Sequence, residues 1–340
     1  MIPAGFAQIF LAATVAMLPV QARHAAPVKH AAPAKHAVPA KAGAQAKSAD
    51  FDANLAMQVA LDRAGFSVGV IDGAAGANMR KASAAYQAAM GSAPDPAAAP
   101  AIIDYVITAA DAAGPFSEKI PTDMAEKSKL PGLYYSSVAE ALGERFHTSP
   151  EVLKRLNPSA TFAAVETIKV PNVIVVEMPQ AGAPAAPAAP AAPAAPKAPA
   201  AKLPAVTVSV SKSAAAATVT DASGKVIFYA PVTSGSEHDP LPIGKWTVTA
   251  IVRNPTFNYN PALFWDAEPG DTKAKLPAGP NGPVGVVWID ISKPHYGLHG
   301  TPEPQTIGHT QSHGCVRLTN WDAMRLAALV SKGTAVVFTR

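Results

Sequence analysis

The single cysteine of this 340-residue chain, Cys315, stands among histidines. His295, His299, His309 and His313 all precede it within 20 residues. A cysteine attacks an acyl carbon as its thiolate, so it needs a neighbouring base or donors that lower its pKa. The density of imidazoles beside one thiol therefore indicates acyl-transfer chemistry, with Cys315 as the candidate nucleophile.

The residues flanking the thiol suit the same chemistry. Gly314 allows close approach of the backbone, and the N–H groups of Gly314 and Cys315 can face a developing oxyanion. Arg317 lies two residues beyond Cys315, so in an extended segment both side chains share a face. We expect Arg317 to hold a substrate carboxylate or to stabilise the thiolate.

Two other readings of the cluster stay open from the residues alone. Cys315 beside a histidine can be a structural core residue. The histidines and the cysteine can also bind zinc, as in a zinc hydrolase. The pair His309 and His313 is not part of a helical pattern, because Gly308 precedes it and Gly314 follows it. We therefore predict no metal and no cofactor.

The whole segment resembles the signature of the L,D-transpeptidases, the YkuD-like catalytic family. The residues that carry the resemblance are His299-Gly300-Thr301, Ile307-Gly308 and Ser312-His313-Gly314-Cys315-Val316-Arg317, with an upstream turn at Pro242-Ile243-Gly244-Lys245-Trp246. The resemblance implies that Cys315 is the nucleophile and that His299, oriented by the Gly300 carbonyl, is the proton donor and acceptor. It further implies an oxyanion hole at Gly314, supporting roles for Ser312 and His313, and substrate binding by Arg317.

The resemblance also implies the substrate. Cys315 would form a thioester with a peptidoglycan stem peptide and release D-Ala, and an amine of a second stem would complete a 3–3 cross-link. With water as the acceptor, the same residues make an L,D-carboxypeptidase, and with an outer-membrane protein they anchor that protein to the wall. A peptidoglycan-binding protein without turnover is a further alternative.

The predicted elements around this motif form a domain over residues 204–340. Apolar residues alternate from Val206 onward, and Asp221–Lys225 reads as a hairpin turn. Further strands are predicted at 246–252, 284–289 and 335–338. One helix is predicted at 321–331, with Asn320 as its cap. The pattern is typical of a β-rich, mainly antiparallel domain.

A turn-rich stretch at 253–283 interrupts the strands of this domain. Loops of this length are uncommon unless they bind something or are disordered. Phe257, Tyr259, Phe264 and Trp265 lie within it. These aromatic side chains are expected either to cover the substrate or to fill a core.

Two small modules are predicted upstream, which makes the fold class multidomain. Residues 51–112 resemble a helical peptidoglycan-binding domain, and a plain helical hairpin is the alternative. Residues 131–176 read strand–helix–helix–strand, with Leu133-Tyr134-Tyr135 opening the pattern and Ser149 capping the second helix. They resemble a degenerate LysM module. Both resemblances imply wall glycan as a partner.

The remaining segments are connectors and an export signal. Residues 1–22 are predicted to be a signal peptide, which places the protein in the periplasm or cell wall. Residues 23–50 form a basic Ala/Pro/Lys/His tether, and 179–203 form an Ala/Pro linker that marks a domain boundary. Five of the 28 basic residues fall in the first tether, so no folded part is basic enough to indicate nucleic-acid binding.

Overall fold

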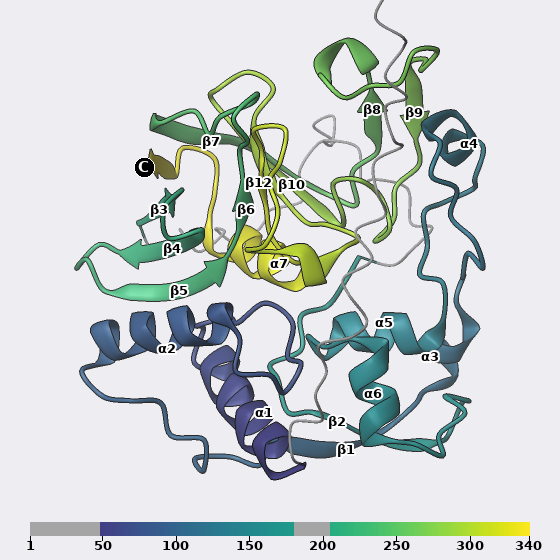
Figure 1. Cartoon of the computed structure of the whole chain (residues 1–340), viewed down its shortest axis with the longest axis vertical. Coiled ribbons are helices and arrows are strands. Elements are labelled where there is room, and N and C mark those ends of the chain that lie inside the picture. The colour runs from purple at the N-terminus through teal and green to yellow at the C-terminus, as the bar shows by residue number, and fades with distance from the viewer. Residues whose placement is uncertain (1–47, 180–204) are drawn as a thin grey trace, which may run out of the picture. The chain divides into compact units, whose positions relative to one another are not determined.

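The computed structural model describes residues 48–179 and 205–340 (Figure 1). The predicted signal peptide, nearly all of the first tether and almost the whole Ala/Pro linker lie outside these ranges. The described residues belong to one compact unit. Within the described part of the chain, no helix is long and apolar enough to cross a membrane.

The first two helices lie close to where the sequence predicts them. Helix α1 spans Ser48–Arg63 and α2 spans Ala77–Met90. The apolar residues of α1, among them Leu55 and Leu61, are buried in a shared core with Phe66 and Ile71 of the connecting loop. The α2 helix ends at Gly91, whose φ of 74° is the left-handed conformation that glycine adopts without strain.

The next segment of the chain begins and ends with the two strands of a small sheet. Strand β1 (Ile102–Val106) pairs antiparallel with β2 (Thr167–Pro171). Between them lie the helices α3 (Ala109–Ala113), α4 (Met124–Ser128), α5 (Val138–Arg145) and α6 (Pro150–Leu156). The side chain of Ser149 caps α6 and Pro150 occupies its first turn, as the sequence predicts.

The strand expected at Leu133-Tyr134-Tyr135 is wrong. The strand that pairs with β2 is β1, which begins 31 residues earlier in the chain. The backbone of Leu133 is engaged elsewhere, because its N–H donates to Ala278 and its carbonyl accepts from Asn281. Those partners lie in the 253–283 stretch, so this segment packs against the downstream domain.

Residues 205–340 form the predicted β-rich domain around a nine-stranded sheet. Its order is β5-β4-β3-β13-β7-β10-β11-β12-β6. The strands are β3 (Val206–Ser211), β4 (Ala216–Asp221), β5 (Val226–Pro231), β6 (Thr233–Ser234), β7 (Gly244–Arg253), β10 (Val287–Ile291), β11 (Gly297–His299), β12 (Val316–Arg317) and β13 (Ala335–Thr339). Neighbours are antiparallel except β3 with β13 and β11 with β12. Helix α7 (Asn320–Leu329) packs its buried residues into the same core.

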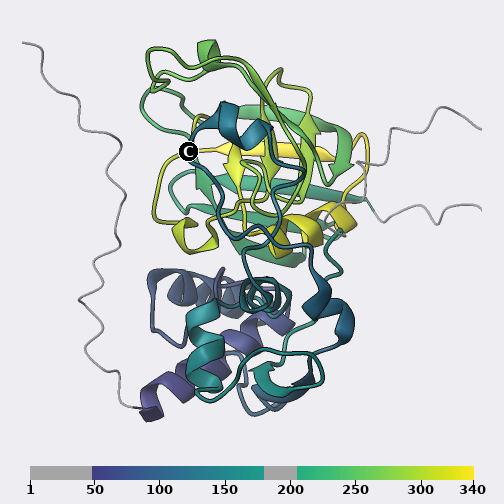
Figure 2. The same ribbon diagram turned by 90° about the vertical axis from the view of Figure 1, so that its right-hand side faces the viewer.

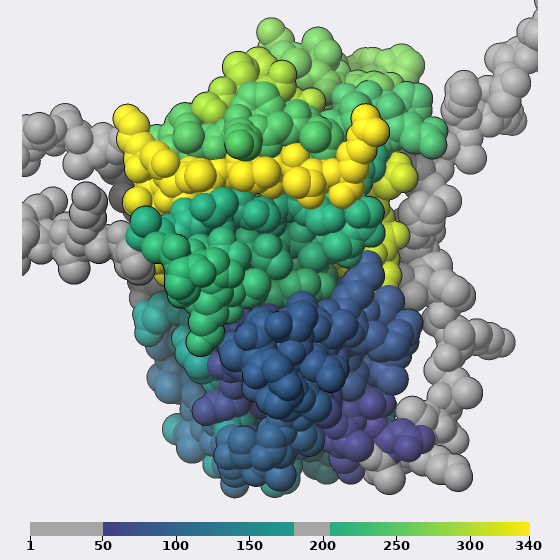
Figure 3. All heavy atoms as spheres, turned by 90° about the vertical axis from the view of Figure 1, so that its left-hand side faces the viewer, coloured from purple at the N-terminus to yellow at the C-terminus, as the bar shows by residue number. Residues whose placement is uncertain are grey.

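The edge strand β5 is covered by the loop after α1. Ser67 donates its N–H to the Tyr229 carbonyl at 2.8 Å, and the Tyr229 N–H donates to the Gly65 carbonyl at 2.9 Å. The rings of Phe66 and Tyr229 stack with centroids 6.3 Å apart. An exposed strand edge offers unpaired backbone groups to other chains, and these contacts close it. Figure 3 shows the blue residues around α2 directly against the green strands of this edge.

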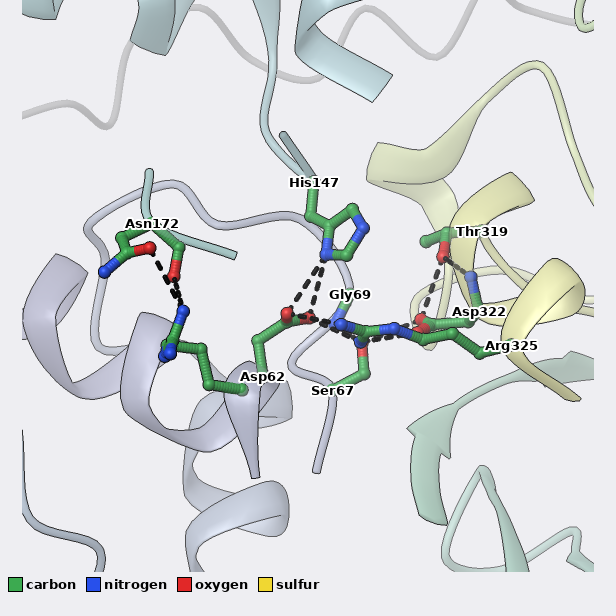
Figure 4. Close-up of polar contacts among 9 residues, drawn as sticks. Asp62, Ser67, Gly69, His147, Asn172, Thr319, Asp322 and Arg325 are labelled. Carbon is green, nitrogen blue, oxygen red and sulfur yellow. Dashed lines mark hydrogen bonds and ion pairs between the residues drawn. The ribbon is translucent and has the colours of Figure 1, made fainter. Parts of the chain in front are cut away.

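A buried polar cluster joins the upstream helices to α7 (Figure 4). The Arg325 guanidinium donates to both carboxylate oxygens of Asp62, at 2.8 and 2.9 Å. His147 Nδ1 lies 3.0 Å from the same carboxylate. Ser67 Oγ donates to Asp322 Oδ2 at 2.7 Å. Burial raises the pKa of Asp62, but His147 and Arg325 outweigh it and hold that pKa well below its ordinary value.

Candidate active site

The neighbouring strands β11 and β12, near one edge of the sheet, bring the predicted site residues together. They are parallel neighbours in which His299 is opposite Arg317 and Leu298 is opposite Val316. Cys315 directly precedes β12. His299, Cys315 and Arg317 all line one cavity of about 870 Å³. Residues 16 and 18 positions apart in sequence therefore meet because the sheet places their strands side by side.

The His299 ring is buried and held by its own backbone. Its Nδ1 lies 2.6 Å from the Gly300 carbonyl oxygen, as the resemblance implies. The ring also stacks on Trp288, with centroids 5.3 Å apart and an interplanar angle of 18°. Burial, with the nearby charge of Arg317, lowers the pKa of His299 to about 3. The ring is therefore neutral at physiological pH. With Nδ1–H donated to the carbonyl, Nε2 is left as the base.

The Cys315 thiol faces opposing influences. Burial raises its pKa, while the Gly297 backbone and the Arg317 charge act to lower it. Its Sγ lies 3.8 Å from the His295 carbonyl oxygen. A thiol with a raised pKa beside a neutral imidazole is not an ion pair at rest. Such a nucleophile must lose its proton to the base as it attacks.

The turn before the thiol is fixed by Ser312 and Gly314. Ser312 Oγ donates to the Cys315 carbonyl at 2.5 Å and accepts from the Gly235 N–H at 2.8 Å. Gly314 has a φ of 99°, and a Cβ there would lie 2.5 Å from the Tyr296 ring. Both residues therefore shape the backbone around Cys315.

The described structure places His313 against the 253–283 stretch. Its Nε2 lies 2.8 Å from Asp266 Oδ1, and its ring packs edge-on against Phe264 at 5.1 Å. The side chain lines the cavity as well. His313 thus connects the turn before Cys315 to the 253–283 stretch.

That stretch carries a small sheet of its own, β8 (Phe257–Tyr259) paired with β9 (Ala274–Leu276). Tyr259 and Leu276 form a small core with Leu133. Phe257 and Phe264 pack beside that core and also line the cavity. Helix α4 packs on β9, as the side view shows (Figure 2). The aromatic residues thus divide between the two expected roles.

Trp265 takes neither role. Its side chain is 58% exposed, and it stacks on His238 with centroids 4.3 Å apart.

Several residues of the cavity were missed by sequence reasoning. Trp288, Tyr296 and Asp239 line it beside the predicted residues. Trp288 lies in β10 directly opposite His299, so its place follows from strand register, which one sequence does not reveal. Tyr296 follows the candidate His295, and an aromatic ring next to the histidine cluster is the one signal that could have indicated it.

The predicted cap of the helix after the motif is wrong. Thr319 caps α7, since its side chain accepts from the Asp322 N–H. Asn320 is the first residue of the helix and is completely buried. An acidic residue in the first turn is typical of a helix start, and Asp322 lies three residues after Thr319. This spacing indicates Thr319 as the cap. The Asn320 side-chain amide instead forms hydrogen bonds with the loops around it.

A metal site has no support in the described residues. Across 48–179 and 205–340, no group of three or more histidine, cysteine or acidic side chains is arranged to hold a metal ion.

Comparison with known proteins identifies the downstream domain. Residues 205–338 match the family model of the YkuD L,D-transpeptidase catalytic domain. This segment is thus similar to L,D-transpeptidase catalytic domains, and it is called the transpeptidase domain after that match. YkuD of Bacillus subtilis, named as an L,D-transpeptidase, is 34% identical over 113 residues, which are 30% of this chain and 66% of that protein. ErfK/SrfK of Escherichia coli, named likewise, is 34% identical over 125 residues, or 33% of this chain and 40% of its own length.

The chain thus spans less than two thirds of the length of these relatives. Among solved structures, L,D-transpeptidase 3 of Mycobacterium tuberculosis with a faropenem-derived adduct is 22% identical. That likeness covers 40% of this chain and 61% of that one, with a TM-score of 0.34. Only the transpeptidase domain is matched by the family model, so the upstream modules stay predictions.

Proposed function

We propose that this protein is a cysteine L,D-transpeptidase that acts on peptidoglycan stem peptides. The observation that carries the proposal is the placement of a backbone-held His299, the Cys315 thiol and Arg317 in the lining of one cavity. The match of the transpeptidase domain to named L,D-transpeptidases supports the substrate class.

In the first half-reaction, Cys315 Sγ attacks the carbonyl that joins the third residue of a donor stem to its terminal D-Ala. The thiol proton passes to His299 Nε2, which is the free ring nitrogen because Nδ1–H is donated to the Gly300 carbonyl. The N–H groups of Gly314 and Cys315 stabilise the oxyanion. The C–N bond then breaks, His299 returns its proton to the leaving amine, and a thioester remains on Cys315.

The second half-reaction reverses these roles with a new amine. The side-chain amine of a neighbouring stem attacks the thioester, His299 accepts its proton, and the thiol is regenerated with a 3–3 cross-link formed. Arg317 holds the donor in both steps. Its charge and the two aromatic side chains Phe257 and Phe264 give the cavity a polar wall and an apolar wall.

The acceptor defines the biological outcome. Water gives an L,D-carboxypeptidase, and an amine on an outer-membrane protein gives wall anchoring. The predicted export signal and wall-glycan binding by the upstream modules fit all three outcomes.

The test is mass spectrometry of muropeptides incubated with the purified full chain. The proposal expects D-Ala release together with a cross-linked dimer, and Cys315→Ala should abolish both products and the covalent adduct with a carbapenem. Trimmed monomers without dimers would assign the carboxypeptidase activity. An adduct that persists in Cys315→Ala would contradict the proposal.

A further inference from the structure

The buried Asn320 side chain lies against the residue that orients the His299 ring. Its Oδ1 accepts from the Val286 N–H at 3.2 Å. A Cβ built on Gly300 would lie only 2.1 Å from this oxygen, and one on Gly285 only 1.9 Å. The amide thus occupies space that exists because both positions are glycine.

Gly300 lies just beyond the end of its strand, where the packing of the Asn320 amide can affect its position. β11 ends at His299, and the Gly300 N–H reaches the Val287 carbonyl at 3.3 Å. Its own carbonyl oxygen is the partner of His299 Nδ1 at 2.6 Å. A shift of Gly300 therefore moves the acceptor that sets the tilt and tautomer of the ring.

The Asn320 amide is held in turn by a carboxylate from outside the transpeptidase domain. Its Nδ2 donates to the two oxygens of Glu144, at 2.9 and 3.0 Å, and to the Pro280 carbonyl at 3.3 Å. Glu144 belongs to α5 and is buried. It also accepts from the Tyr135 hydroxyl at 3.0 Å. Burial raises the pKa of Glu144 to about 8, and the hydrogen bonds from Asn320 and Tyr135 hold this carboxyl group in place.

We propose that Glu144 is a positioning residue of the transpeptidase site. It bonds to the Asn320 amide, which packs against Gly300, and the Gly300 carbonyl orients His299 for proton transfer. The inference rests on the proposed role of His299 as acid and base. It gives the upstream segment a part in turnover that is separate from the wall binding predicted for its modules.

The central experiment measures single-turnover acylation of the full-length chain by a carbapenem. Glu144→Ala leaves Asn320 Nδ2 with the distant Pro280 carbonyl alone, so Gly300 and the ring lose their fixed geometry. Small misplacements of reacting groups cost up to about 100-fold in rate. We expect the acylation rate constant at saturation to fall about 10- to 100-fold. The half-saturating concentration should change less than about 3-fold, because Glu144 does not line the substrate cavity.

The matched control disturbs the same interface without touching Asn320. Ser67→Ala removes the hydrogen bond to Asp322 on the same helix, α7. It should lower the melting temperature yet leave the acylation rate constant within about 2-fold, because Gly300 keeps its support. A loss in Ser67→Ala equal to that in Glu144→Ala would show a general effect of docking and overturn the proposal.

A donor–acceptor exchange tests the contact itself. Asn320→Asp alone sets two carboxylates face to face and should lose at least as much rate as Glu144→Ala. Adding Glu144→Gln restores one donor and one acceptor, and should recover the rate to within about 5-fold of the wild type. This pair also decides the matter if Glu144→Ala does not fold. No recovery in the exchanged pair, or wild-type acylation in Glu144→Ala, would refute the inference. A wild-type protein that forms no adduct would instead contradict the proposed function.

Discussion

At the scale of single residues, the proposed chemistry depends on a histidine that is already neutral. Burial and Arg317 hold the pKa of His299 at about 3, and burial raises the pKa of the Cys315 thiol. The reactive form is then a thiol beside a neutral base, and it is the populated form over the whole physiological range. An enzyme that relied on a thiolate–imidazolium pair would need a lowered thiol pKa and a raised imidazole pKa.

This assignment predicts the pH profile of acylation. The single-turnover rate constant with a carbapenem should be flat between about pH 5 and 7, because neither His299 nor Cys315 changes its protonation there and the pKa of Glu144 lies higher, at about 8. Stopped-flow or mass-spectrometric sampling across this range is the measurement. His299→Ala serves as the control and should be about 10²- to 10⁴-fold slower at every pH. A limb centred near pH 6.5 would mean that the free His299 ring titrates normally.

A second prediction at this scale concerns Arg317. Its guanidinium is expected to bind the donor stem through a planar fork that lysine lacks. Arg317→Ala should raise the KM for a tetrapeptide donor by about 10-fold or more, and Arg317→Lys should recover only part of this loss. Steady-state assays of D-Ala release give both constants. An unchanged KM in Arg317→Ala would remove the residue from the donor site.

At the scale of elements, the first turn of α7 contains the buried carboxyl group of Asp322. Its neighbours offset the cost of removing its charge from water only in part. Burial raises the pKa of Asp322 to about 7, and nearby Arg325 opposes the shift only partly. The ordinary value is 3.8. The folded state therefore retains a proton that the unfolded chain has lost between about pH 4 and 7. The stability from this group is fully present below pH 4 and is lost as pH rises to about 7.

The corresponding prediction concerns the difference between the wild type and Asp322→Asn, because the lowered pKa of His299 makes stability rise with pH over part of the same range. The free energy of unfolding of the wild type relative to that of Asp322→Asn should fall by about 1–3 kcal/mol between pH 4 and 7. Urea unfolding at a series of pH values measures it. Asp104→Asn alters an exposed carboxyl group and should leave the slope as in the wild type. Equal slopes in wild type and Asp322→Asn would exclude this residue as the cause.

The elements themselves show what one sequence can and cannot predict. The strand β3 follows from alternation of apolar residues, because it buries one face only. The placement of Leu133 could not be predicted, since it depends on backbone partners at Ala278 and Asn281 far along the chain. The motif indicates His299, Cys315 and Arg317 directly. Trp288 and Asn320 act through strand register and loop packing, which local sequence does not encode.

At the scale of the whole molecule, the upstream helices and the transpeptidase domain share a buried charge cluster. The Ala/Pro linker predicts two separable halves, and nothing in the sequence around Asp62 or Glu144 distinguishes them from ordinary helix residues. Their partners, Arg325 and Asn320, lie 263 and 176 residues away. Contacts at such separations become visible only in the folded structure.

This cluster predicts a large effect of removing its cation. Arg325→Met leaves the Asp62 carboxylate buried with His147 as its remaining partner. The loss of one member of a buried pair typically costs about 3–5 kcal/mol. Urea unfolding should show that loss, and Asp62→Asn combined with Arg325→Met should recover part of it. A double variant no more stable than Arg325→Met would show that the uncompensated charge is not the source of the cost.

The covered edge of β5 has a consequence for solubility. Gly65 and Ser67 occupy the outward-facing N–H and carbonyl of Tyr229 in this strand, and Phe66 stacks on the Tyr229 ring. A transpeptidase domain produced without the upstream segment would present an open strand edge beside a bare aromatic ring. Such edges pair with one another, so the shortened protein should self-associate in proportion to its concentration. We therefore expect the upstream segment to reduce aggregation of the protein.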